Sequence, residues 1–167
     1  GEWALGQAED HYATAYEPLE VKRAAANMAG ITAQNKLLGD AKTKAEDKYL
    51  LLDAYGVAEY TMAAKVRYGD IQYQHGQKIA NAPIPSFIVA AAQKNPDLLA
   101  TFETTRDQEL KKYLVEAKRQ WVEVLDAAKK GGISNRWSRL AQENLGREFP
   151  GEFTVLRQEL VQGTDAP

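Results

Sequence analysis

The chain has 167 residues, of which 44% are hydrophobic and 26% are charged, so it is long enough for one folded domain or a short repeat array. Its 21 basic and 23 acidic residues are interspersed and leave a net charge of -2. Nucleic-acid-binding proteins usually carry a basic stripe, which this sequence lacks, so we expect no nucleic-acid partner. The absence of cysteine excludes a disulfide framework and a cysteine-ligated zinc site.

No apolar run approaches the roughly 20 residues of a membrane-spanning helix. The longest run, Phe87–Ala92, is far too short, and we therefore expect no membrane span. The chain opens with Gly1, Glu2 and Trp3, already in patterned sequence and without an initiator methionine. We interpret it as a fragment or a processed product of a larger repeat protein, which leaves a signal peptide or lipid anchor of that protein an open question.

Apolar residues recur at spacings of three and four along nearly the whole chain, which predicts helices. In chain order, this pattern and its glycine and proline stops predict helices over residues 2–16, 21–38, 41–55, 59–79, 86–94 and 98–130, then one capped by Ser134 or Asn135, and a last one that carries Phe153, Leu156 and Leu160. The expected fold class is all-α. We expect one helical domain over residues 1–162 and a polar tail at 163–167.

Two prolines, Pro83 and Pro85, directly follow the fourth predicted helix. Proline fixes its own backbone and restricts the residue before it, so this stretch cannot continue a helix. We expect an irregular linker near residues 81–87, which crosses as an extended segment and packs Ile84 and Phe87 onto a neighbouring helix. Such a rigid linker can set the angle between two helical stacks, whereas the alternative is a surface turn without that role.

Two stretches resemble the tetratricopeptide repeat (TPR), a helix–turn–helix unit of about 34 residues. Trp137, Leu140 and Ala141 match the first helix of the unit, although Asn144 stands where the pattern has an aromatic residue. Upstream, the spacing of Ala117–Leu125 matches the second helix of a preceding unit. Weaker matches are Tyr68-Gly69 with Gly76, and Leu5-Gly6 with Tyr12.

The segment Ala58–Phe87 (AEYTMAAKVRYGDIQYQHGQKIANAPIPSF) resembles large TPR cell-envelope proteins of deltaproteobacteria, including myxobacterial gliding-motility proteins. In those proteins an A-A-x-x-x-x-G helix runs into N-x-P-x-P, and a long helix and a glycine turn then lead to N-x-W. The matching residues here are Ala63, Ala64, Gly69, Asn81, Pro83, Pro85, Asn135 and Trp137. The resemblance covers Gly1–Phe149 at the level of the family. It implies a TPR-like antiparallel helix-hairpin stack, a right-handed α-solenoid, in a periplasmic or cell-envelope location.

No residues combine into a recognisable catalytic or metal-binding motif. The two histidines, His11 and His75, form no His-x-x-x-His or Glu-x-x-His pair, and we expect both to face solvent. The three serines lie outside any G-x-S-x-G motif, and no phosphate-binding loop is present. We therefore expect that the protein is not an enzyme and uses no metal and no cofactor.

TPR stacks bind peptides or partner proteins along a concave face. Six side chains off the packing seam are candidates for such a groove, namely Asp70, Tyr73, Gln74, Asn135, Ser138 and Gln142. This pattern predicts a non-catalytic protein–protein interaction module with a protein or peptide partner. The alternative is a purely structural helical segment of a larger complex, with no groove of its own.

Four residues are expected at the crossings between helices. Trp121 and Trp137 occupy seam positions on successive helices, which predicts that both indoles are largely buried. Gly69 and Ala141 are small enough to let two helices approach closely. If they lie at such crossings, a larger side chain at either position would overpack the core.

Overall fold

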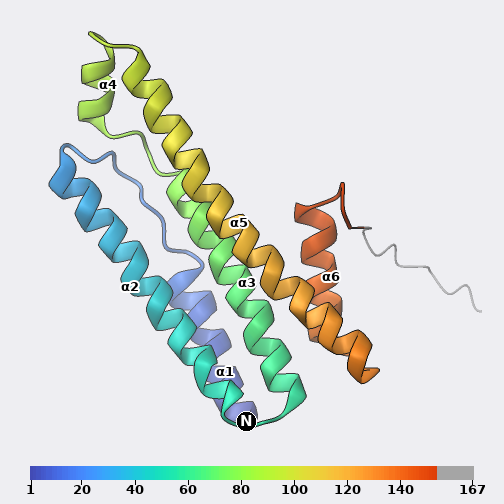
Figure 1. Ribbon diagram of the computed structural model, residues 1–167. Coiled ribbons are helices and arrows are strands. Elements are labelled where there is room, and N and C mark those ends of the chain that lie inside the picture. Colours follow the sequence, from blue (N-terminus) through green and yellow to red (C-terminus); the bar gives the residue numbers. More distant parts are fainter. Residues whose placement is uncertain (154–167) are drawn as a thin grey trace, which may run out of the picture.

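A computed structural model describes residues 1–153, and all regular secondary structure in that range is helical (Figure 1). The predicted all-α class is therefore confirmed. The elements are α1 (Glu2–His11), the π-helical turn η1 (Tyr12–Tyr16), α2 (Met28–Asp53), α3 (Ala58–Ala80), α4 (Ser86–Ala92), α5 (Asp97–Gly131) and α6 (Arg136–Glu148). The last predicted helix and the tail at 163–167 lie outside the described residues, apart from Phe153.

Helix α3 lies at the centre of the molecule, with α1 and α2 on one side and α5 and α6 on the other (Figure 1). The N-terminus and the turn between α2 and α3 lie at one end, and α4 lies at the opposite end (Figure 1). The buried apolar residues of α1, α2, α3, α5 and α6 form one continuous core. Helices α2, α5 and α6 pack directly on α3, whereas α1 packs on α2 and the short α4 packs on α5.

Helices α3 and α5 pack closely at Gly69, where the Trp121 indole covers the bare backbone. A Cβ atom added at Gly69 would lie only 2.3 Å from Trp121 Nε1, so no side chain fits there. Trp121 is 1% exposed and Trp137 is 2% exposed, which confirms that both indoles are buried. Ala141 is also fully buried, in agreement with its predicted place at a crossing.

The predicted break at Gly39–Asp40 is wrong, because α2 runs without interruption from Met28 to Asp53. The helix also begins later than predicted, since the Asn27 side chain caps it by accepting a 2.9 Å hydrogen bond from Gly30 N. A glycine inside a helix costs about 1 kcal/mol relative to alanine. Burial of Leu38 and Tyr49 on the face toward the core offsets that cost.

The turn between α5 and α6 shows which of two candidate residues caps α6. Gly132 ends α5 in the left-handed conformation, with φ of 61°, which favours glycine. The cap of α6 is Asn135, whose side chain accepts hydrogen bonds of 3.0 Å from the backbone of Trp137 and Ser138. Ser134 takes no part in this cap.

The irregular linker between α3 and α4 covers Asn81–Pro85 and is held from two directions. Ser86 N donates a 2.9 Å hydrogen bond to the carbonyl of Ala25, in the nonhelical segment before α2. Arg106 of α5 donates one of 2.9 Å to the carbonyl of Ala82. The linker is therefore anchored to two other parts of the chain.

The expectation that His75 faces solvent is wrong. The side chain is 5% exposed, and its ring packs edge-on against Tyr113 of α5 with 4.9 Å between ring centroids. Burial, helped by the nearby ammonium groups of Lys42 and Lys78, lowers the pKa of His75 from 6.5 to about 4. His75 is a neutral core residue at pH 7.

Gly69→Ala should destabilise the protein by about 1–3 kcal/mol, because the added methyl group displaces the Trp121 indole. Gly39→Ala is the matched control, since a Cβ atom there meets nothing within 4 Å and alanine favours the helix. Urea unfolding followed by circular dichroism measures both. Equal effects of the two substitutions would contradict the close α3–α5 crossing.

Acid should weaken the fold through His75. The unfolded imidazole titrates near pH 6.5 and the folded one near pH 4, so the unfolded chain binds the extra proton between these values and stability falls as the pH falls. Compared with His75→Gln, the wild type should lose roughly 1–2 kcal/mol more between pH 7 and pH 4.5. Parallel stability curves for the wild type and His75→Gln would contradict a buried neutral His75.

Candidate functional site

A buried carboxylate, Asp70 of α3, gathers donors from three helices. Its Oδ1 accepts hydrogen bonds from Trp121 Nε1 of α5 at 3.1 Å and from Asn144 Nδ2 of α6 at 2.6 Å. Its Oδ2 accepts one of 2.8 Å from Arg67, which lies one turn earlier in α3. The Trp121 N–H also lies 3.2 Å from the carbonyl of Val66. The carboxylate thus fixes α5 and α6 on the same stretch of α3.

Arg67 extends this network to the N-terminal half of the chain. Its Nε donates to Glu9 Oε1 of α1 at 2.8 Å, and its second terminal nitrogen pairs with the other oxygen of Glu9. The Tyr49 hydroxyl of α2 donates to the same Glu9 oxygen at 2.7 Å. One chain of charged and polar contacts therefore connects α1, α2, α3, α5 and α6.

The two carboxyl groups of this network have opposite pKa shifts. Burial raises the pKa of Asp70 above its ordinary value, against the opposing effect of Arg67. Burial also acts to raise the pKa of Glu9, but hydrogen bonds from Arg67 and Tyr49 outweigh it and the pKa lies below its usual value. The lowered pKa keeps the Glu9 carboxylate ionised near neutral pH, where it forms an ion pair with Arg67.

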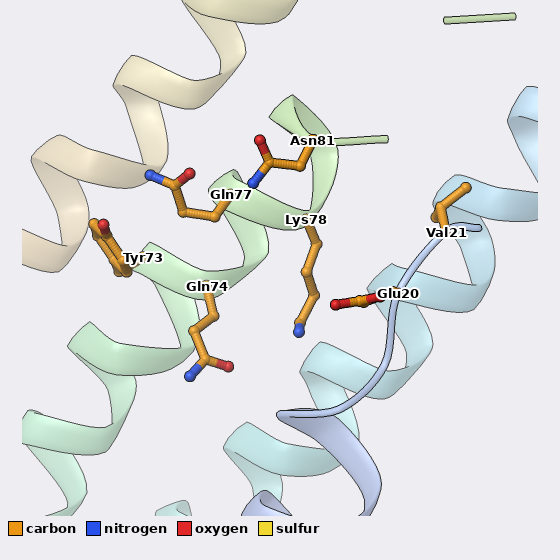
Figure 2. A pocket seen from close by; sticks show the side chains of 7 residues that line it. All are labelled: Glu20, Val21, Tyr73, Gln74, Gln77, Lys78 and Asn81. Atoms are coloured by element: carbon orange, nitrogen blue, oxygen red, sulfur yellow. The ribbon is translucent and has the colours of Figure 1, made fainter. Parts of the chain in front are cut away.

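Two open cavities follow one face of α3, beside this network. The first has a volume of about 220 Å³ and is lined by Asp70, Tyr73 and Gln74 together with residues of η1, α5 and α6. The second has a volume of about 320 Å³ (Figure 2), and its lining residues are Glu20, Val21, Tyr73, Gln74, Gln77, Lys78 and Asn81. Tyr73 and Gln74 line both cavities. We therefore treat the two cavities together as one groove, the α3 groove.

The groove has an α3 floor and a wall formed by the segment after η1. Figure 2 shows Gln74, Gln77 and Lys78 projecting from α3, with Glu20 on the opposite segment. Lys78 Nζ donates a 2.8 Å hydrogen bond to the carbonyl of Glu17, which holds that segment beside α3. The Gln74 amide nitrogen donates to the Tyr12 hydroxyl at 2.6 Å, whereas its oxygen is buried and has no hydrogen-bond partner among residues 1–153.

Tyr73 stands where the two cavities meet. Its ring packs against the Trp121 indole, with 6.0 Å between centroids, and its hydroxyl donates to the Glu148 carboxylate. Burial and this hydrogen bond raise the pKa of Tyr73 to about 12, so the phenol stays protonated. One part of the ring is covered and the remainder borders the groove.

The structure brings together three of the six residues predicted for the groove, Asp70, Tyr73 and Gln74. Asp70 is nevertheless buried and engaged within the network. Asn135 and Ser138 lie at the start of α6, where each side chain accepts from the backbone of the other, and they act as a capping box. Gln142 is half-buried on α6 and lines neither cavity of the groove.

Sequence reasoning missed several groove residues that the helical repeat could have supplied. Gln77 and Lys78 follow Tyr73 and Gln74 by four positions, so they lie on the same helix face. In the sequence, Asn144 differs from its surroundings only in that it departs from the TPR pattern. Its amide donates to Asp70, which an aromatic residue without a polar group could not do.

Neither a metal-binding cluster nor a similarity to known proteins assigns a function to this site. Within residues 1–153, no three His, Asp or Glu side chains gather in a way that would hold a metal ion. Among the described helices, none is long and apolar enough to cross a membrane. Comparison with protein-family models, curated proteins and solved structures finds no match to the chain.

Asn144→Ala should destabilise the protein by about 1–3 kcal/mol, because it removes a donor from the buried Asp70 carboxylate. Gln142→Ala on the same helix is the control, and it should change stability by less than about 0.5 kcal/mol. Thermal and urea unfolding measure both. A neutral Asn144→Ala substitution would contradict a structural role for the Asp70 network.

Proposed function

We propose that this protein is a non-catalytic protein–protein interaction module of a bacterial cell-envelope assembly, and that the α3 groove binds an extended peptide segment of its partner. The observation that carries the proposal is the pair of cavities that share Tyr73 and Gln74 as lining residues. The proposal requires no metal and no cofactor. It assigns no direct contact with nucleic acid.

The side chains of the groove suit a peptide backbone. Gln74, Gln77 and Asn81 carry amides, which both donate and accept hydrogen bonds, as the N–H and C=O groups of an extended peptide do. The charged side chains that line the two cavities balance, with Glu20 and Lys78 in the second cavity and Glu17, Asp70, Arg67 and Arg147 in the first, which favours a segment without a large net charge.

The proposal includes two more specific statements: the helices are arranged as in TPR proteins, and the protein is located in the cell envelope. Support for the repeat comes from the α5–α6 pair, in which the seam residues Ala117, Trp121, Trp137 and Ala141 of the pattern are all buried. Support for the location comes from the family resemblance of the segment Ala58–Phe87. The TPR-like arrangement and the envelope location are both proposed in addition to the all-α fold.

A peptide library displayed on phage tests the groove. Peptides selected on the wild-type protein should bind the double variant Tyr73→Phe/Gln77→Ala about tenfold more weakly, since it loses polar contacts in the groove. Gln108→Ala, on the exposed face of α5, is the control and should bind as the wild type does. Calorimetric titration measures the affinities.

The choice of variant separates binding from folding. Tyr73→Phe keeps the ring packed on Trp121, whereas Tyr73→Ala would also remove a core contact. Unchanged affinity in a double variant that unfolds at the same temperature as the wild type would reject the α3 groove. Failure to select any peptide would favour the structural alternative.

Exposed apolar side chains at the N-terminal end favour that alternative, a purely structural segment of a larger complex. Trp3 is 78% exposed and Leu51 is 63% exposed, and Tyr55 and Val57 are exposed as well. Trp3 lies at the start of α1 and the other three at or near the turn between α2 and α3, and these two parts of the chain lie at the same end of the molecule (Figure 1). Large exposed apolar patches mark contact surfaces. Analytical ultracentrifugation of the wild type and of Trp3→Ser/Leu51→Ser would detect self-association through this end.

A further inference from the structure

A separate cavity of about 200 Å³ lies beside the proline linker, between α2, the end of α3 and α5. Only Val21 lines both this cavity and the α3 groove. The walls are mostly apolar, and they include Ile31, Leu38, Ile79, Pro83, Pro85 and Phe102. The two prolines, which end α3, thus also form part of a cavity wall.

The cavity contains one guanidinium group, that of Arg106, whose bonding is incomplete. One terminal nitrogen donates to the Ala82 carbonyl at 2.9 Å, and the group lies 5.5 Å from the centre of the Phe102 ring. The Nε–H is buried and has no hydrogen-bond partner in the part of the chain that the structure covers. Arg106 also makes no ion pair with any residue up to Phe153. Arg106 is half-buried, and an anion beside such a partly desolvated guanidinium group forms charge-assisted hydrogen bonds with it.

The other polar groups of the wall leave Arg106 as the dominant charge. Among the described residues, Glu109 is the one acidic residue that lines the cavity, and its carboxylate pairs with Lys112 of the same helix. Gln34, Asn35 and Thr105 are neutral. A ligand that fits must therefore combine an apolar body with a single negative group.

The volume of the cavity limits the size of the apolar body of the ligand. A cavity of about 150 Å³ holds a benzene molecule, so the present one admits roughly one aromatic ring with a short substituent. A carboxylate accepts from a guanidinium through charge-assisted hydrogen bonds, which are stronger than neutral ones. Such a ligand gives Arg106 an anionic partner and covers the apolar wall at once.

We propose that this cavity binds a small organic acid, with its apolar body against Ile79, Pro83 and Phe102 and its carboxylate on Arg106. The site is distinct from the α3 groove, and its existence does not depend on a peptide partner. The proline linker is a wall of the site, so ligand binding stabilises the junction between α3 and α4. The test uses the full 167-residue chain.

Phenylacetate is the probe, and its affinity is measured by titration of the Arg106 Nε–H resonance in NMR spectra. Three related compounds separate the contributions: 2-phenylethanol lacks the charge, phenethylammonium has the opposite charge, and acetate lacks the apolar body. Phenylacetate should bind about tenfold or more tightly than each of them and should shift the Nε–H resonance. Equal binding of 2-phenylethanol, or no shift with phenylacetate, would overturn the proposal.

Two variants test the site from the protein side. Arg106→Gln should weaken phenylacetate binding by about tenfold or more, as calorimetry measures, whereas Arg139→Gln on the exposed face of α6 should have no effect. Ala82→Leu retains Arg106 and fills the cavity, so it should also abolish binding. This second variant keeps the test decisive if Arg106→Gln fails to fold. Unchanged affinity in Ala82→Leu, or in a folded Arg106→Gln, would refute the site.

Discussion

The contact between the Trp121 indole and the bare backbone at Gly69 is the constraint on which the rest of the structure depends. It sets how closely α5 approaches α3, and α3 is the helix around which the others pack. The indole covers the crossing, while its N–H points to the Val66 carbonyl and the Asp70 carboxylate. A single side chain therefore provides both apolar packing and a polar connection at the centre of the molecule.

The position of that indole explains why a buried carboxylate is tolerated. Asp70 would be costly in the core if it were alone, but it has Arg67, Trp121 and Asn144 as donors. The contacts of Arg67 with Glu9 then carry the network to α1, on the far side of α3. Removing one member leaves the others buried and unpaired, so the network acts as a unit that fixes one arrangement of five helices.

The possible binding surfaces arise where regular helices give way to irregular backbone. The segment from Glu17 to Asn27 crosses the molecule and is fixed to α3 through Lys78, to α2 through a hydrogen bond from Gln34 to the Arg23 carbonyl, and to the start of α4 through Ala25. One side of this segment borders the α3 groove, and Val21 borders the cavity at the proline linker. Both spaces are therefore products of how a nonhelical segment lies across helices.

The sequence by itself determined the helical class, most helix bounds and the buried seam of Trp121, Trp137 and Ala141, because apolar spacing and helix stops are local properties of the chain. It misjudged α2, since Gly39 resembles a stop until the burial of the neighbouring helix face is known. It also placed His75 in solvent, because a lone histidine gives no signal of what packs against it. The tertiary structure alone decided that Asp70 and Asn144 meet across 74 positions of sequence, and which polar residues line the α3 groove. Those outcomes depend on long-range helix packing, which a residue pattern within one helix cannot specify.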